Sequence, residues 1–217
     1  MSYQLVIGDK NISSWSLRPW LAMKHAGLPF REINIVLRGP DTKAQILSYS
    51  PAGKVPALLA GGDVIWDSLA ILEFLAEAHP DARLWPAAPA ARALARSVSA
   101  EMHSGFAALR EHCSMDIVAR VPMASLPEAV EVDVRRIVAI WRDCRSRFGV
   151  GGPLLFGAFT AADAMYAPVA TRFRTYLPDL SSYGDDGTAQ AYVDAVFALP
   201  AMAAWERESQ GGPSAAG

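Results

Sequence analysis

The stretch that decides the fold is Ser50–Leu75, which runs S-P-A-G-K-V-P-A-L-L-A-G-G-D-V-I-W-D-S-L-A-I-L-E-F-L. Within it, Pro56–Ala60 is a short apolar run, the glycine-rich Gly61–Asp63 is a hairpin signal, and Val64–Trp66 is a second apolar run. A helix is expected directly afterwards, because the next two residues, Asp67-Ser68, are preferred N-caps and apolar side chains then recur at helical spacing. The stretch therefore predicts a β-hairpin that leads into a helix.

The start of this helix is also a candidate anion site. The first turn of a helix has backbone N–H groups without intrahelical partners, and these groups attract negative charge. Asp67 and Ser68 are equally compatible with simple capping of the helix, and Pro56 with an ordinary trans proline at the start of an edge strand. The stretch taken alone leaves both alternatives open.

The residues before this stretch predict a β-α-β unit. The apolar, β-branched run Tyr3–Ile7 predicts a first strand, and a helix is expected from near Ser16 to Gly27. Phe30–Leu37 predicts a second strand, parallel to the first through a right-handed crossover, and Thr42–Leu47 a brief helix. Strand, helix, strand, short helix, hairpin and helix together form the thioredoxin-like order of elements.

The composition changes after residue 79, where Pro80, Pro86 and Pro89 fall within ten residues and the pattern becomes helical only. We therefore expect a thioredoxin-like domain over residues 1–79 and an all-helical domain over residues 90–210. Apolar residues at spacings of three and four predict two long helices, one from Leu94 to Cys113 and one from Val130 to Phe148.

Three further helices are expected in this second domain. The first begins at Thr160 as N-cap, with Asp163 bonding back to close a capping box. The second spans Thr188–Leu199, and the last starts at Pro200 and ends near Glu208.

Composition excludes several classes of partner. Of the 217 residues, 19% are charged and the net charge is −2, so no basic field exists to hold nucleic acid or an anionic membrane surface. No signal peptide or long apolar span is seen, so a cytoplasmic protein is expected. Cys113 and Cys144 show no C-x-x-C or metal spacing and are expected to be buried thiols. The four histidines show no ligand spacing, so no metal is expected.

Three motifs resemble the cytosolic glutathione transferase superfamily: the Val55-Pro56 strand start, the following Asp67-Ser68, and T-A-A-D at Thr160–Asp163. The run S-S-W-S-L-R, at Ser13–Arg18, resembles the serine-type members and is closest to the S-S-C-S motif of zeta/theta-like bacterial members. The resemblance implies an α/β thioredoxin-like N-terminal domain followed by an all-α C-terminal domain. It covers nearly the whole chain.

The resemblance also implies a reactive serine. Glutathione reacts as its thiolate, which a hydroxyl at the positive end of a helix stabilises by a hydrogen bond. By the match, Ser13 is the hydroxyl nearest the sulfur and Ser14 is second; the alternative is that both serines only cap the helix. Trp15 stands where the zeta motif has cysteine, which argues for a stabilised thiolate over a mixed disulfide.

The resemblance assigns the rest of the glutathione site residue by residue. Val55 would pair its backbone with the cysteinyl part, which implies a cis bond to Pro56. Asp67 would bind the γ-glutamyl amino group and Ser68 its carboxylate. Candidates for the remaining contacts are Trp15, Lys54, which is as well explained as a solvated lysine, and the weaker Gln45.

A second substrate is expected between the domains. Its candidate contacts are Trp15, Phe106, Arg110, Tyr166 and Arg172. An aromatic residue at helical spacing is as compatible with the core as with a pocket, which applies to Phe106. Arg172 and the nearby Arg174 are expected either to anchor an acidic substrate or to face water.

The function implied is a glutathione transferase that adds glutathione to a small hydrophobic electrophile, or uses it transiently, in detoxification. A glutathione-dependent isomerase or peroxidase is one alternative, and a non-enzymatic interaction module is another. The resemblance also implies a homodimer, in which Glu101 would be offered to the partner's site.

Overall fold

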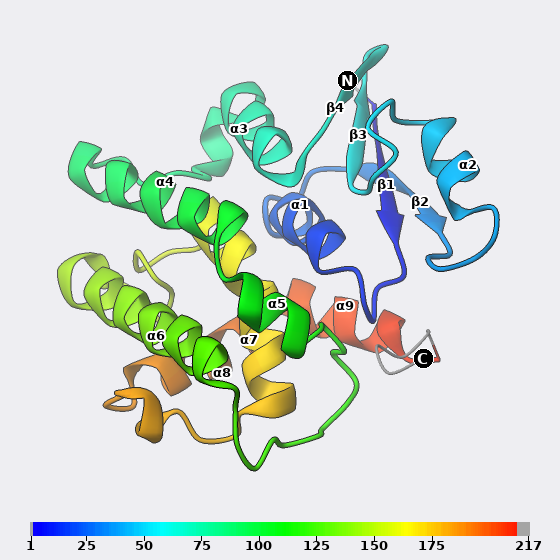
Figure 1. The fold of residues 1–217 in the computed structure, drawn as a ribbon. Helices are drawn as coiled ribbons and strands as arrows, with labels where there is room; N and C mark the ends of the chain where they lie inside the picture. The colour runs from blue at the N-terminus through cyan, green and yellow to red at the C-terminus, as the bar shows by residue number, and fades with distance from the viewer. Residues whose placement is uncertain (1, 212–217) are drawn as a thin grey trace.

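The computed structural model describes residues 2–211 and begins with a four-stranded mixed sheet (Figure 1). The strand order is β2-β1-β3-β4; β1 and β2 are parallel, and the other two pairs are antiparallel. The strands are β1 (Tyr3–Gly8), β2 (Phe30–Ile35), β3 (Ala57–Ala60) and β4 (Asp63–Ile65). The predicted hairpin and the parallel first pair are confirmed, with strand ends shifted by one or two residues.

The two faces of the sheet are covered by different helices, because alternate residues of a strand point to opposite sides. Val6 and Ile35 pack with Ile46 of α2 on one face, whereas Leu5 and Ile7 join the large core with α1 and α3 on the other. These helices are α1 (Ser14–His25), α2 (Thr42–Leu47) and α3 (Ser68–Ala78). The thioredoxin-like order of elements is therefore confirmed.

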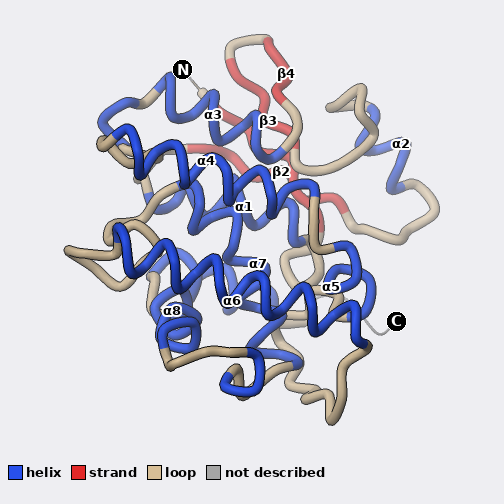
Figure 2. Tube along the Cα trace, turned by 60° about the vertical axis from the view of Figure 1, so that its left-hand side comes forward, coloured by secondary structure: helices blue, strands red, loops and turns tan. Residues whose placement is uncertain are grey.

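The rest of the described chain is helical. Figure 2 shows α4 and α6 running side by side across the molecule. The helices are α4 (Pro89–Ser104), α5 (Ala107–His112), α6 (Glu128–Phe148), α7 (Ala161–Tyr176), α8 (Thr188–Phe197) and α9 (Pro200–Ser209), with 3₁₀ turns at Pro80–Ala82 and Ser181–Tyr183. No helix within residues 2–211 is both long enough and apolar enough to cross a membrane.

The single helix expected from Leu94 to Cys113 is wrong. Two helices, α4 and α5, replace it, because Gly105 is extended and Phe106 takes the left-handed conformation with φ 59°. A Cβ at Gly105 would come within 2.8 Å of the Glu101 carbonyl oxygen, so the backbones approach too closely there for any other residue without a shift. The break turns α5 out of the line of α4.

Helix α7 joins the two halves of the molecule. Its N-terminus has the expected capping box between Thr160 and Asp163, and the Asp163 carboxyl also accepts from the Leu155 N–H. Almost all of α7 is buried, and it packs against both α1 and α4. Trp20 of α1 also meets Trp205 of α9, with ring centroids 4.9 Å apart. One continuous core therefore fixes the serine-bearing helix against the helical domain.

Candidate active site

The loop after β1 delivers two serines to the start of α1. Ser13 is the N-cap residue, but its hydroxyl donates to the Ser16 hydroxyl at 2.7 Å and makes no capping bond. The Ser16 oxygen also accepts from the Gly8 N–H at 3.0 Å. Ser14 follows as the first helical residue and lines a cavity. Both candidate hydroxyls thus lie at the positive end of a helix, nearly buried.

A cavity of about 570 Å³ adjoins this helix end and gathers most of the predicted glutathione residues. Asp67 and Ser68 line one side, and Lys54, Val55 and Pro56 another. The Val55-Pro56 bond is cis, as the resemblance implied. The remaining lining residues are Trp15, Leu37, Ile46, Ala52, Gly53, Trp66 and His103. Segments distant in sequence therefore meet in one pocket.

Gln45 is not part of this cavity. Its side chain is exposed on α2, whereas its neighbour Ile46 is buried and lines the cavity. One residue along a helix turns the side chain by about 100°, so adjacent residues of α2 face different surroundings. The weaker candidate of the sequence analysis is therefore placed outside the pocket.

Asp67 caps α3 and also faces the helical domain. Its Oδ1 accepts from the N–H groups of Leu69 and Ala70 at 3.0 and 3.5 Å, so the capping interpretation holds. Its Oδ2 lies 2.9 Å from His103 Nε2 of α4. A ligand amino group at Asp67 would have to share this second oxygen with His103. One carboxylate thus serves the helix end, the domain contact and the cavity wall.

Arg18 is a site residue that the sequence analysis missed. Its side chain is 1% exposed and donates from Nη1 to the fully buried Ser68 hydroxyl at 3.3 Å, while its Nε has no partner. Burial lowers its pKa well below the usual value, and the charges of Arg110 and Arg172 lower it further. The available signal was its place in S-S-W-S-L-R, one helical turn after Ser14.

A second cavity, of about 280 Å³, lies on the other side of Trp15. It brings together three predicted residues, Trp15, Arg110 and Arg172, and adds Ser14. The other lining residues are Ile12, Leu37, Arg38, Ser114 and Met115. The two cavities share Trp15 and Leu37.

Two predicted contacts lie outside both cavities. Tyr166 is fully buried and donates its hydroxyl to the Val98 carbonyl at 3.1 Å, so it joins α7 to α4 instead of facing a substrate. Burial raises its pKa well above the usual value. Phe106 is also buried, at the left-handed residue between α4 and α5, and belongs to the core. Helical spacing predicted that both side chains point inward, but it did not predict whether they face the hydrophobic core or a cavity.

The second cavity is strongly cationic. Arg172 donates from Nε to the Cys113 carbonyl at 2.8 Å and from Nη1 to the Pro168 carbonyl at 3.0 Å. Arg110 donates to carbonyls at the end of α4, including Gly105 at 3.0 Å, and its Nη1 is buried without a partner. Burial and the neighbouring Arg110 lower the pKa of Arg172 to about 10. Within residues 2–211, neither guanidinium makes a hydrogen bond to a carboxylate.

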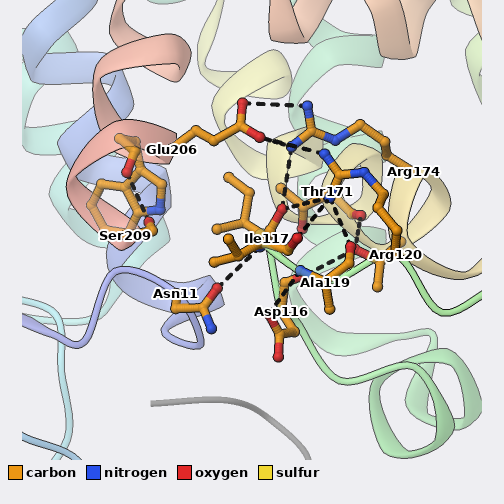
Figure 3. Close-up of polar contacts among 12 residues, drawn as sticks. Asn11, Asp116, Ile117, Ala119, Arg120, Thr171, Arg174, Glu206 and Ser209 are labelled. Atoms are coloured by element: carbon orange, nitrogen blue, oxygen red, sulfur yellow. Dashed lines mark hydrogen bonds and ion pairs between the residues drawn. The ribbon is translucent and has the colours of Figure 1, made fainter. Parts of the chain in front are cut away.

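Two lining residues of this cavity, Ser114 and Met115, come from a segment without regular secondary structure, residues 113–127 between α5 and α6. Figure 3 shows how it is held: the Val118 N–H donates to Asn11 Oδ1 at 3.2 Å, in the same loop as the serines. Arg174 donates to the Ile117 carbonyl at 3.2 Å and pairs with Glu206 of α9. Arg174 therefore fixes this segment, and it lines neither cavity.

Three other groups were singled out by sequence. Glu101 binds Arg136 of its own chain through both oxygens, at 2.7 and 2.8 Å, which occupies the carboxylate expected to serve a partner. Cys113 and Cys144 are buried free thiols, and burial raises the pKa of Cys144 to about 12. No group of three His, Cys, Asp or Glu side chains within residues 2–211 is placed to hold a metal ion.

Comparison with known proteins identifies the family. Residues 12–78 match the glutathione S-transferase N-terminal domain, and residues 126–208 match the C-terminal domain. The chain belongs to the glutathione S-transferase family. Within it, the chain is similar to a maleylacetoacetate isomerase from Rattus norvegicus, 29% identical over 78% of this chain and 77% of the other.

Other relatives match over shorter stretches. A probable maleylacetoacetate isomerase from Caenorhabditis elegans is 38% identical over 92 residues, and the match spans 42% of each chain. A zeta-class glutathione S-transferase from Euphorbia esula is 40% identical over 35% of this chain and 34% of the other. Among solved structures, a glutathione transferase homologue from Burkholderia with bound glutathione has TM-score 0.71 at 22% identity, over 97% of this chain and 98% of that one. This last likeness shows the shared fold.

Proposed function

We propose that this protein binds glutathione in the 570 Å³ cavity and uses its thiolate on a small carboxylate-bearing electrophile in the 280 Å³ cavity. The observation that carries the proposal is the position of Ser13 and Ser14. They lie at the N-terminus of α1, beside the wall that the two cavities share. A sulfur placed there would meet a hydroxyl donor and a positive helix end on one side and the second substrate on the other.

Glutathione suits the larger cavity because the cavity walls contain groups that can bind its ammonium group and groups that can bind its carboxylates. The Asp67 carboxylate suits the γ-glutamyl ammonium, and the start of α3 at Ser68 suits the neighbouring carboxylate. Lys54 is exposed at the rim, where it suits the glycyl carboxylate. Arg18 contacts this site through the hydrogen bond that it donates to Ser68.

The arginines change the expected second substrate. A hydrophobic electrophile would supply no counter-charge to the buried Arg172, and the half-buried Arg110 would have only the charge of Asp133, which is unfavourable in a cavity of low dielectric constant. A substrate carboxylate would offset both the burial of Arg172 and the charge of Arg110, which together lower the pKa of Arg172. We therefore assign an unsaturated carboxylic acid in place of the hydrophobic compound.

Isomerisation is the reaction that we favour, and the similarity to maleylacetoacetate isomerases supports it. The thiolate adds to one carbon of a cis double bond conjugated to a carbonyl, and the π electrons move to the carbonyl oxygen as an enolate. The former double bond, now single, rotates. The enolate then restores the carbonyl and a trans double bond while the C–S bond breaks, so the thiolate leaves unchanged. The guanidiniums would stabilise the enolate.

Thiol stoichiometry tests the reaction type. Maleylacetoacetate would be incubated with enzyme and glutathione, and substrate loss and free thiol measured together. Isomerisation consumes no thiol, addition consumes one thiol per substrate, and peroxide reduction, assayed with cumene hydroperoxide, consumes two. Loss of substrate with one thiol consumed per turnover would contradict isomerisation and support a conjugating transferase.

A non-enzymatic interaction module is the other candidate. Such a module has no need of a buried hydroxyl pair or an anion site facing one cavity. Calorimetric titration with glutathione separates the two: millimolar or tighter binding supports the enzyme, and absence of binding supports the module.

We also propose a homodimer, on the strength of the family alone. Glu101 does not add to this argument, because Arg136 of the same chain holds it. Sedimentation equilibrium at micromolar concentration tests the dimer. A mass near 23.3 kDa at every concentration would refute it.

A further inference from the structure

Trp15 separates the two cavities. Its half-buried indole lines both of them, and Leu37 is the one other residue that the two linings share. It stands on the first turn of α1, directly after Ser14, so it is adjacent to the place proposed for the sulfur. A change at Trp15 would therefore alter the lining of both cavities.

Two guanidinium groups pack on the indole. The Cζ of Arg18 lies 4.1 Å from the ring centroid, and the Cζ of Arg110 lies 4.8 Å from it. The ring of His103 meets the indole edge-on at 5.4 Å. A cation on the face of tryptophan is stabilised by about 0.5–2 kcal/mol, and a residue without an aromatic ring offers no such contact.

The two guanidiniums have different surroundings, and Arg18 itself lines neither cavity. Arg18 donates to Ser68, at the anion site of the larger cavity, whereas Arg110 lines the smaller one. Burial lowers the pKa of Arg18, and the charge of Arg110 lowers it further. Arg110 is otherwise held by carbonyls at the end of α4 and has an unpartnered, buried Nη1. The indole thus holds two like charges close together, one bonded to the wall of the larger cavity and one in the lining of the smaller.

The indole also limits the space beyond the sulfur. The smaller cavity measures about 280 Å³. At roughly 30 Å³ per water-sized group, a space of this size accepts about nine such groups. A short carboxylate chain fits, whereas a fused aromatic ring system on the sulfur fills or exceeds the space.

We propose that Trp15 determines the specificity of the second cavity, by positioning the Arg110 guanidinium for a carboxylate and by excluding bulky groups. The proposal rests on the proposed function, because it takes the glutathione sulfur to lie at the N-terminus of α1. The substrate class is a short carboxylate-bearing chain on or next to the sulfur.

Glutathione derivatives substituted on sulfur test the proposal by binding alone. The probes are S-(2-carboxyethyl)glutathione, its neutral isostere S-(2-carbamoylethyl)glutathione, and the bulky S-(1-naphthylmethyl)glutathione. Isothermal titration with the wild-type protein should give roughly tenfold tighter binding of the carboxylate than of the amide, as a charge-assisted hydrogen bond implies. The naphthylmethyl derivative should bind most weakly.

Three substitutions separate the two roles of the indole. Trp15→Leu keeps much of the bulk but no ring, so the carboxylate-to-amide ratio should fall toward one while the naphthylmethyl group stays excluded. Trp15→Phe keeps an aromatic face and should retain most of the ratio. Trp15→Ala should lose the ratio and bind the naphthylmethyl derivative more tightly, relative to glutathione, than the wild type does. Circular dichroism establishes that each variant is folded.

Trp66→Ala is the matched control. Trp66 is a tryptophan too, more exposed at 46%, but it lines only the larger of the two cavities. Its loss should weaken all probes alike and leave the carboxylate-to-amide ratio unchanged.

The outcomes distinguish this inference from the proposed function. A wild-type protein that binds none of the probes, nor glutathione, refutes the proposed function. A wild-type ratio of one removes the carboxylate specificity, and a ratio that survives in both Trp15→Leu and Trp15→Ala overturns the role of Trp15 alone. A ratio lost equally in Trp66→Ala would also overturn it. If Trp15→Ala does not fold, Trp15→Leu and Trp15→Phe still decide the positioning role.

Discussion

The two cavities are built in different ways. Much of the larger cavity comes from two short segments, residues 52–56 and 66–68, that flank one hairpin. The smaller cavity is assembled from four separate places: residues 12–15, 37–38, 110–115 and 172. A local sequence motif can therefore predict the larger cavity, whereas the smaller cavity forms only when the domains pack together.

The two cavities also differ in charge. The larger contains both a carboxylate, Asp67, and an ammonium group, Lys54, as a zwitterionic ligand requires. The smaller has arginines and no acidic residue in its lining. Separate changes in the two linings should therefore affect separate substrates, and the predictions below test that independence.

The largest effect is expected for Arg172→Met. Truncating one partner of a buried charge pair typically costs about 2–5 kcal/mol, so kcat/KM for an unsaturated carboxylate should fall by roughly 100-fold. Because Arg172 lines the smaller cavity and not the larger, the affinity for glutathione should change little. Steady-state kinetics and glutathione titration measure the two effects side by side.

Two variants control this experiment. Arg172→Lys keeps the charge and should recover part of the loss, while Arg147→Met removes an exposed arginine that pairs with Asp143 on α6 and should change neither substrate. An equal loss of glutathione affinity in Arg172→Met would show that the cavities are not independent.

The next effect concerns the thiolate. Ser13→Ala should lower turnover by about 10- to 150-fold, from the loss of about 1.5–3 kcal/mol in a hydrogen bond to a charged group. The affinity for glutathione should stay within a few-fold, because the tripeptide contacts are intact. The structure adds a competitor: Ser14 lines the second cavity, whereas the Ser13 hydroxyl donates to Ser16. Ser14→Ala is therefore measured in parallel.

The thiol pKa of bound glutathione identifies the donor. Thiolate absorbance against pH should show a higher pKa in the variant that lacks the direct donor and a smaller change in the other. Ser97→Ala, an exposed serine on α4 that donates only to the Ala93 carbonyl, provides the control. Unchanged turnover in both serine variants at saturating glutathione would remove the serines from the mechanism.

The part of the fold that follows local rules was predictable from sequence. The hairpin before α3 and the capping box at Thr160 and Asp163 are set by neighbouring residues, and both occur as expected. The break at Gly105 was missed because the apolar spacing continues through it. The signal was the glycine itself, whose backbone lies against the Glu101 carbonyl.

The part of the site that depends on tertiary packing was only partly predictable. Arg110 and Arg172 were candidates, but periodicity equally selected Tyr166, which faces α4. Arg18 was not selected, because a charged residue in a helical pattern is normally assigned to the surface. Its burial follows from the packing of α1 against both the sheet and α7, which no single segment specifies.

A smaller effect is expected at the anion site. Asp67→Ala and Ser68→Ala should raise the half-saturating glutathione concentration about tenfold with little change in limiting rate, because these contacts are far from the sulfur. Ser68→Ala should also lower stability, since it leaves the buried Arg18 without its hydroxyl partner. Thermal unfolding separates the two effects, and Asp67→Asn, which can still accept a bond, isolates the charge. A fall in limiting rate alone would mean that the anion site is misplaced.

The smallest effect is expected for Lys54→Ala. This variant and Gln45→Ala compare the two candidates for binding the glycyl end of glutathione. Lys54 is exposed at the rim of the larger cavity, and an exposed ion pair contributes about 0.2–1 kcal/mol, so the dissociation constant for glutathione should rise by about two- to fivefold. Gln45→Ala, on the exposed face of α2, should leave it unchanged. Salt sharpens the test, because screening weakens exposed charge pairs. The difference between wild type and Lys54→Ala should shrink as sodium chloride increases, whereas any contribution of Gln45 would persist. A salt-independent loss in Gln45→Ala would place the glycyl end of glutathione over α2 instead of at Lys54.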